Sequence, residues 1–201
     1  MSKVLYIKAN AKEEGESRTF KISDSFIEEY KRLNPDDEII TLDLYKEGVA
    51  ALPFGQLNEL HVPAPGTGKD HPILKYAYQF LEADKYVIAE PLWNLGIPAI
   101  LKAYIDYITV TGITFKYTAT GAVGLCTGKK AINITARGGI YNTEPFASFE
   151  MGDRYLRTIF AFLGITDFTT ISADGLDIIG NDINAIVEKA IMEAKEKANS
   201  F

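Results

Sequence analysis

The stretch YVIAEPLWNLGIPAILKAYID, residues 86–106, joins an apolar run to a helical pattern through a turn that carries the only tryptophan of the chain. Its first four residues are consecutive apolar side chains, which is typical of a strand buried on both faces. From Ile97 onward apolar residues recur at helical spacing. Pro98 stands in the first helical turn, where its missing N–H costs nothing. This strand–turn–helix unit predicts a parallel sheet whose strands are separated by helices.

The same unit recurs on either side of this stretch. Apolar runs predict five strands, at residues 4–7, 38–43, 86–89, 131–135 and 168–171. Helical spacing predicts helices ending near Leu33, a helix that Asp70 caps, and helices over 97–108, 146–163 and 183–194. Between residues 47 and 70, prolines and glycines predict a long irregular excursion, and such loops are often functional. The whole chain, 1–201, is therefore expected to be one α/β domain with a doubly wound five-stranded parallel sheet, order 2-1-3-4-5, and helices on both faces.

Bulk composition excludes several classes of partner. The net charge is −6, so nucleic acid and anionic membranes are poor ligands, and an anionic small molecule must be held by local donors. Cys126 is the only cysteine, which excludes an intrachain disulfide and fits a cytoplasmic protein. The apolar run near the N-terminus is too short for a signal peptide, and no run has the length of a membrane-spanning helix.

Ligands of open parallel sheets bind beyond the carboxyl ends of the strands, and the loop after the first predicted strand has donors there. Asn10 opens this loop, and Ser17, Arg18 and Thr19 lie at the mouth of the next helix. Free helix N–H groups and two hydroxyls make a phosphate site. Simple N-capping by Ser17 is an equally good explanation of the same residues.

Two further loops are unusual at the same edge. The turn Leu92-Trp93-Asn94-Leu95 places a flat ring and free amides where a heteroaromatic ligand would bind, although a tryptophan wedged into the core is the alternative. The loop Ala136-Arg137-Gly138-Gly139 follows the fourth predicted strand. Its glycines permit close approach of backbone to a ligand, whereas a flexible turn is the alternative. Three such loops at one edge together favour a ligand site.

Other chemistries lack their motifs. No GxGxxG follows the first strand, and no GxSxG is present. The segment GLCTGKK, 124–130, is one residue too short between its glycines for a P-loop and lacks the final Ser or Thr, so we interpret it as the turn into the fourth strand. His61 and His71 lie ten residues apart near prolines, and with one cysteine they form no recognisable metal site.

Five segments together resemble the FMN-dependent NADH-azoreductase and quinone reductase family, and the likeness is closest to its Bacillus-type members. They are MSKVLYIKAN at the start, PLWNLGIPAILKAYIDY, GITFKYTATGAVGL, GKKAINITARGG and Gly164-Ile165-Thr166. The resemblance covers essentially the whole chain and implies a flavodoxin-like fold. It implies that Leu92, Trp93, Asn94 and Leu95 lie against the isoalloxazine ring of FMN. It also implies that Ala136, Arg137, Gly138 and Gly139 hold another part of the ring, and that Ser17, Arg18 and Thr19 hold the phosphate near Asn10.

The resemblance implies that NADH reduces FMN, and that a quinone or azo compound then takes the same place and is reduced in a ping-pong cycle. Full cleavage of an azo bond to two amines needs four electrons, hence two rounds. Because the cofactor carries the hard step, no side chain is named as a catalytic base. An electron-carrier flavodoxin, a general NAD(P)H:FMN reductase and a flavin-binding regulatory module are the alternatives.

A homodimer with active sites at the subunit interface is also implied by the resemblance. Aromatic residues are expected near the ligand edge, where interface cores are enriched in such side chains: Phe115, Tyr117, Tyr141, Phe160 and Phe162. For Phe160 a place in the core is the preferred interpretation. Tyr117 and Phe162 are the residues expected to contact the acceptor, with Phe162 reaching the pocket from the partner subunit.

Overall fold

A computed structural model describes residues 1–13, 15–55 and 68–201. Five parallel strands form one sheet in the order β2-β1-β3-β6-β7, which confirms the predicted order along the sheet. The bounds of these strands are β1 Lys3–Lys8, β2 Glu38–Asp43, β3 Lys85–Pro91, β6 Lys130–Ala136 and β7 Asp167–Ala173. All five cover the apolar runs from which they were predicted.

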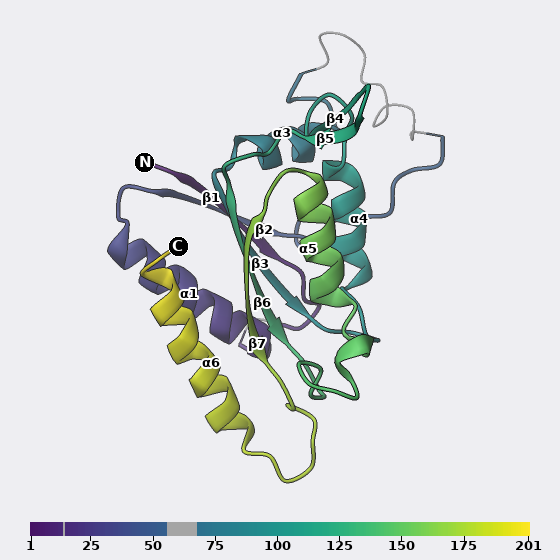
Figure 1. The fold of residues 1–201 in the computed structure, drawn as a ribbon. Helices are drawn as coiled ribbons and strands as arrows, with labels where there is room; N and C mark the ends of the chain where they lie inside the picture. Colours follow the sequence, from purple (N-terminus) through teal and green to yellow (C-terminus); the bar gives the residue numbers. More distant parts are fainter. Residues whose placement is uncertain (14, 56–67) are drawn as a thin grey trace.

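Helices cover both faces of the sheet, as expected. Their bounds are α1 Arg18–Leu33, α3 Lys75–Glu82, α4 Ala99–Ile108, α5 Gly152–Phe162 and α6 Ile183–Ala198. Figure 1 shows α1 and α6 side by side on one face and α4 and α5 on the other. The consecutive apolar residues of β3 serve both layers, because Val87 and Ala89 pack towards α1 and α6, whereas Tyr86 and Ile88 pack on the opposite face.

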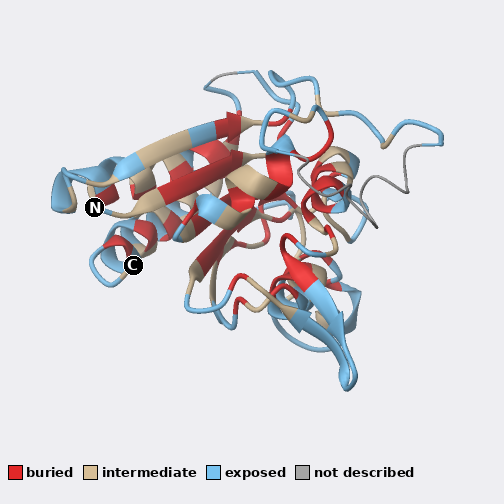
Figure 2. Ribbon diagram, turned by 90° about the horizontal axis from the view of Figure 1, so that it is seen from above, coloured by how far each residue is buried: buried red, intermediate tan, exposed pale blue. Residues whose placement is uncertain are grey.

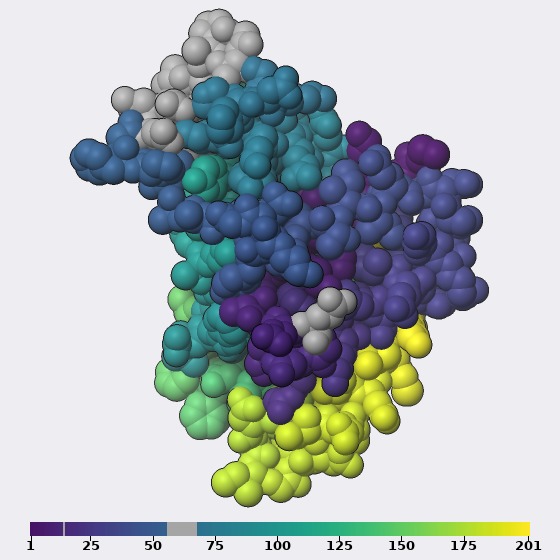
Figure 3. Space-filling model, turned by 180° about the vertical axis from the view of Figure 1, so that it is seen from behind, coloured from purple at the N-terminus to yellow at the C-terminus, as the bar shows by residue number. Residues whose placement is uncertain are grey.

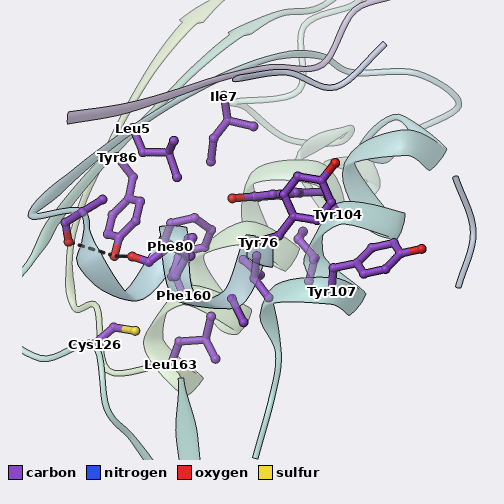
Figure 4. Close-up of a cluster of buried hydrophobic side chains, with 14 of the residues drawn as sticks. Leu5, Ile7, Tyr76, Phe80, Tyr86, Tyr104, Tyr107, Cys126, Phe160 and Leu163 are labelled. Atoms are coloured by element: carbon purple, nitrogen blue, oxygen red, sulfur yellow. Dashed lines mark hydrogen bonds between the residues drawn. The ribbon is translucent and has the colours of Figure 1, made fainter. Parts of the chain in front are cut away.

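Aromatic side chains fill the core on the α3, α4 and α5 side. Phe80 stacks on Tyr86 with ring centroids 4.2 Å apart, and Phe160 meets both rings edge-on (Figure 4). The buried Tyr86 hydroxyl donates to the carbonyl of Phe80 at 2.7 Å, so this polar group is satisfied inside the core. Phe160 is therefore a core residue, as preferred from the sequence.

A two-stranded antiparallel hairpin, β4 Phe115–Thr118 and β5 Gly121–Gly124, lies outside the main sheet and was not predicted. Its residues are mostly exposed, and Figure 2 shows it as a pale-blue projection. A side chain at Gly124 would lie 2.1 Å from the carbonyl carbon of Leu163. The hairpin base therefore packs directly on the end of α5, and only glycine permits this approach.

Two helix starts differ from the prediction. The helix expected to begin at Asp70 begins at Lys75, because residues before it form turns that bury Leu74. The helix expected from residue 146 begins at Gly152 and follows a short 3-10 helix, η1 Ala147–Phe149. Here the Glu150 carboxylate accepts hydrogen bonds from the backbone N–H groups of residues 152–154, at 2.8 to 3.2 Å. The carboxylate thus satisfies the free donors of the first turn and starts the helix there.

The irregular excursion predicted for 47–70 is described in part. Residues 47–55 and 68–70 form turns, bends and irregular backbone, in agreement with the prediction. The prediction for residues 56–67, which include His61, lies outside the described part of the chain.

Candidate functional site

The mouth of α1 is a set of donors directed at the carboxyl edge of the sheet. The Ser17 hydroxyl caps the helix by accepting from the N–H of Phe20 at 3.1 Å, and it also accepts from the Asn10 amide at 2.8 Å. No acidic residue stands in the first turn, so the positive end of the helix is not neutralised. The Thr19 hydroxyl is buried without a hydrogen-bond partner among the described residues. This mouth has the chemistry of an anion site.

The turn after β3 is a tight loop held at both ends. Trp93 and Gly96 exchange backbone hydrogen bonds of 2.9 and 3.0 Å, while Asn94 and Leu95 between them have positive φ angles of 51° and 69°. Leucine in this region is strained, and such strain is held at functional sites by surrounding contacts. One such contact is the N–H of Met151, which donates to the carbonyl of Leu95 at 3.0 Å. Trp93 is 37% exposed, so it is not wedged into the core.

The loop after β6 pairs with the loop after β7 through backbone atoms. The N–H of Leu176 donates to the carbonyl of Arg137, and that of Asp177 donates to the carbonyl of Gly138. From α1, the Arg18 guanidinium reaches the carbonyl of Leu176 at 3.3 Å and the Asp177 carboxylate at 3.2 Å. In the space-filling view from behind, the purple segment that follows β1 accordingly borders the yellow-green segment that follows β7 (Figure 3). These loops therefore form one continuous rim, in which the carbonyl groups of Arg137 and Gly138 accept hydrogen bonds from the loop after β7.

One pocket lies within this rim, at the carboxyl ends of the strands. Each of the three predicted loops contributes residues to its lining: Asn10, Arg18, Thr19, Leu92, Trp93, Ala136, Arg137 and Gly138. The other predicted residues, Ser17, Asn94, Leu95 and Gly139, lie in the same loops but do not line it. Ser17 is 1% exposed, so its side chain supports the pocket by capping α1. Ser17 thus caps α1, which was one alternative for this loop, and ligand binding by its neighbours stays a prediction.

Arg137 lines the pocket, yet its guanidinium is directed into the protein. Only 5% of the side chain is exposed, and it forms ion pairs with Glu150 at 3.4 Å and with Asp174 at 3.5 Å. Next to it, Glu90 is buried at the end of β3, and burial raises the pKa of its carboxyl group to about 7. A buried ionisable cluster therefore lies behind the pocket, at a place where perturbed groups often serve function.

Tyr117 and Phe162 lie at the other end of the sheet, so the expectation that they border the ligand edge of their own chain is wrong. Helix α5 starts beside the pocket, where Met151 bonds to Leu95, and it runs antiparallel to the strands, so its last residue, Phe162, lies near their amino ends (Figure 1). Phe162 packs on Phe115 of the hairpin, with ring centroids 4.9 Å apart, and Tyr117 packs on the same ring at 5.4 Å. Both side chains are exposed, by 38% for Phe162 and 72% for Tyr117.

The geometry of this pocket is that of the ligand site of doubly wound sheets. A family model described as a flavodoxin-like fold matches residues 2–198. The chain belongs to this flavodoxin-like family. A curated relative, FMN-dependent NADH:quinone oxidoreductase 2 of Clostridium acetobutylicum, is 70% identical over the full length of both chains.

Two solved structures of flavodoxin-like relatives are also similar over the full chain. An azoreductase of Bacillus anthracis has a TM-score of 0.89 and 38% identity, with all of both chains covered. An FMN-dependent NADH-azoreductase of the same organism, solved in complex with FMN, has a TM-score of 0.89 and 32% identity, covering all of this chain and 99% of the other. The family resemblance inferred from the five sequence segments is confirmed by these relatives.

Several lining residues of this flavodoxin-like pocket were missed from the sequence: Lys12, Pro91, Leu176 and Asp177. Leu176 and Asp177 follow β7, and the rule that ligands bind beyond strand ends would have pointed to that loop. Glu90 carried a signal too, since it is the one charged residue at the end of an otherwise apolar run. Among the described residues no helix is both long and apolar enough to cross a bilayer, and no group of acidic, histidine and cysteine side chains there has the arrangement of a metal site.

Proposed function

We propose that this protein is an FMN-dependent NADH oxidoreductase that reduces quinones and cleaves aromatic azo compounds to amines. The observation that carries the proposal is the convergence of the three predicted loops on one pocket. The names of the full-length relatives support the same reaction. Bound FMN would supply the redox chemistry, accepting electrons from NADH and passing them to the acceptor.

The residues of the pocket fit an FMN molecule at both ends. The N–H groups of Arg18 and Thr19, with the unpartnered Thr19 hydroxyl, suit the phosphate. Leu92 and Trp93 offer apolar surface to the ring, with Asn94 and Leu95 holding the turn. Ala136 and Gly138 line the pocket and would offer backbone groups to a bound ring, while Ser17, Asn10, Arg137 and Gly139 would position these loops. N–H donors of this kind stabilise negative charge that reduction places on the ring.

A ping-pong cycle belongs to this proposal, because one pocket serves donor and acceptor in turn. Initial rates with NADH at several fixed quinone concentrations should therefore give parallel double-reciprocal lines. Intersecting lines, together with a detectable ternary complex, would contradict the shared place. An azo dye should consume two NADH molecules for each pair of amines released.

The proposal also includes a homodimer in which the partner's Phe162 and Tyr117 close the pocket over the acceptor. Both side chains are exposed at the far end of their own chain, so they are free to contact a second copy. The pocket itself is lined by Trp93, whose exposed apolar ring a partner would cover. Tyr and Phe are typical of such interface cores.

The first test is the identity of the flavin and the fate of NADH. The purified protein should release FMN and not FAD on denaturation, and should oxidise NADH only when a quinone or azo acceptor is present. Release of FAD, or no affinity for flavin, would exclude the proposal. Flavin binding without NADH consumption would favour an electron carrier or a regulatory module, and NADH consumption with free FMN as the preferred acceptor would favour a general NAD(P)H:FMN reductase.

A further inference from the structure

Behind the pocket, the carboxyl ends of β3 and β6 carry polar side chains where the rest of both strands is largely apolar. Glu90 pairs in register with Thr135, and Asn133 lies two residues earlier on β6. Side chains two residues apart share a face of the sheet, and here it is the face of Tyr86 and Ile88, which α4 and α5 cover. All three polar side chains are buried, and Glu90 is only 1% exposed.

This cluster has more acceptors than donors. The Asn133 amide donates to Glu90 Oε1 at 3.3 Å and to Asp153 Oδ1 at 3.1 Å. Glu90 Oε2 and Asn133 Oδ1 are buried and form no hydrogen bond of ordinary geometry within the described chain, and the Thr135 hydroxyl is near enough to Glu90 to lower its pKa but also lacks such a bond. Unpaired buried polar atoms cost free energy. A proton on Glu90 adds a donor, because a neutral carboxyl group carries one O–H.

The surrounding charges act on Glu90 in both directions, because Arg137 lowers the pKa of its carboxyl group and Glu150 raises it, so burial decides that the carboxyl group stays neutral. Three carboxylates and two guanidinium groups converge from the loop after β6, from the start of α5 and from the end of β7: Glu150, Asp153, Asp174, Arg137 and Arg157. An ionised Glu90 would place a second negative charge near Glu150, and Arg137 would offset only part of the cost of burying it. Burial is the main reason that the pKa of Glu90 rises to about 7, and Glu150 raises it further against the opposing effects of Thr135, Asn133 and Arg137.

Glu90 is connected to the pocket in two ways. The next residue, Pro91, lines the pocket, and so does Arg137, whose charge acts on the Glu90 carboxyl group. The Arg137 guanidinium is held by Glu150 and Asp174, while its Nε has no partner in the described chain. An ionised Glu90 would therefore be a third carboxylate that attracts Arg137, beside Glu150 and Asp174.

We propose that Glu90 is a positioning residue whose protonation favours flavin binding, because a neutral Glu90 leaves Arg137 paired with Glu150 and Asp174. The inference rests on the proposed function, because flavin is the ligand whose affinity is controlled. The proton is exchanged with solvent, and no covalent bond to the ligand forms or breaks.

The direction of the effect follows from charge. Ionised Glu90 attracts Arg137, which loosens its pairing with Glu150 and Asp174 in the pocket wall, and adds negative charge behind a pocket for an electron-rich ring. Flavin affinity should therefore fall as pH rises through the pKa of Glu90. By linkage, bound flavin raises this pKa, and the protein takes up a proton when flavin binds just above pH 7.

The test compares flavin affinity with pH in wild type and Glu90→Gln, because glutamine imitates the neutral acid. Riboflavin is used as the probe beside FMN, since it has no phosphate group that titrates in this range. Between pH 6 and pH 8 the Kd of the wild-type apoprotein for riboflavin should rise about fivefold, at the low end of typical couplings between sites. Glu90→Gln should keep the low-pH affinity throughout, and Glu196→Gln, an exposed control, should behave as wild type.

Parallel pH profiles for wild type and Glu90→Gln would overturn the inference, and so would loss of riboflavin binding at pH 6 in a folded Glu90→Gln protein. Infrared difference spectra of the flavin-free protein give an independent readout that needs neither ligand nor a stable variant. Raising the pH from 6 to 8 should remove the band of a protonated carboxyl group, and absence of that change would also overturn the inference. If wild type binds neither flavin while this band titrates, the proposed function fails and the proton site stands.

Discussion

At the scale of single residues, burial decides what a side chain does in this protein. Ser17 and Arg137 have the residue types of ligand contacts, yet both are almost fully buried and bonded to other protein groups. Thr19 is the reverse case, because its buried hydroxyl has no partner in the described chain and lies in the pocket lining. In the proposed FMN site, a ligand would supply the hydrogen bond that this atom lacks.

Glu90 makes stability depend on pH. Its pKa is raised from an ordinary value of 4.5 to about 7 in the folded protein, so the folded state holds a proton that the unfolded chain releases between these values. The resulting stabilisation is complete below about pH 4.5 and is lost as pH rises through 7. Urea unfolding should show that, between pH 5 and pH 8, wild type loses about 2 to 3 kcal/mol of unfolding free energy relative to Glu90→Gln. Wild type should show no such loss relative to Glu196→Gln, and equal differences at both pH values would contradict the shifted pKa.

Gly138→Val should weaken FMN binding far more than it destabilises the fold. The backbone of Gly138 is not in the left-handed region, so the effect is one of bulk. An added Cβ would lie 2.4 Å from Asp177 Oδ2, and this exposed carboxylate can move at little cost, whereas the new methyl groups occupy the pocket. Titration with FMN should give a Kd raised by at least tenfold, with the free energy of unfolding changed by less than about 1 kcal/mol. An unchanged Kd would remove residue 138 from the site.

At the scale of elements, the starts of helices are set by side chains that the sequence displays only in part. Ser17 at α1 and Asp182 at α6 are ordinary caps that bond the N–H three residues on. The start of α5 is different, because Glu150 is held by Arg137 from a distant loop while it caps the helix. A cap that depends on a contact between distant segments is not readable from local pattern, and for this reason the start of α5 was misplaced.

Removing the cap of α1 should affect stability and ligand binding together. Ser17→Ala loses the bonds to the N–H of Phe20 and to the Asn10 amide, and should lower the free energy of unfolding by about 1 to 2 kcal/mol. FMN affinity should fall as well, because the helix mouth loses its fixed geometry. Asp182→Ala is the matched control, since it removes a cap from α6 outside the pocket lining. It should cost similar stability while the Kd for FMN stays unchanged.

At the scale of the whole molecule, the pocket and the aromatic residues that pack on the β4–β5 hairpin lie at opposite ends of one sheet. The three ligand loops share the carboxyl edge, whereas Tyr117 and Phe162 gather around Phe115 near the amino edge (Figure 1). A single chain therefore cannot bring Phe162 to its own pocket without rearrangement of the fold. Any role for Phe162 at the acceptor requires a second chain.

A dimer should consequently be the active species. Analytical ultracentrifugation is expected to give about twice the chain mass of 22.2 kDa. Phe162→Ala should raise the KM for the acceptor while the Kd for FMN stays near that of wild type, because the flavin loops belong to the other end of the chain. Met192→Ala, an exposed apolar truncation on α6, serves as the control. A fully active monomer at assay concentration would contradict this arrangement.

The sequence by itself determined the strands, their order and the three loops that share one pocket, because these depend on local pattern and on one general rule. A run such as residues 86–89 is apolar throughout only if helices cover both faces, and parallel strands separated by helices place all their following loops at one edge. The family resemblance then pointed to the ligand.

Only the tertiary structure decided which residues of those loops line the pocket, and it alone revealed the hairpin and the buried acid. Gly124 meets Leu163, and Glu90 meets Asn133, across long separations in the chain. Such contacts leave no periodic trace in the sequence, because they depend on how packed layers close on one another and not on the conformation of neighbouring residues. The packing of these layers buries Glu90, and this burial raises the pKa of its carboxyl group.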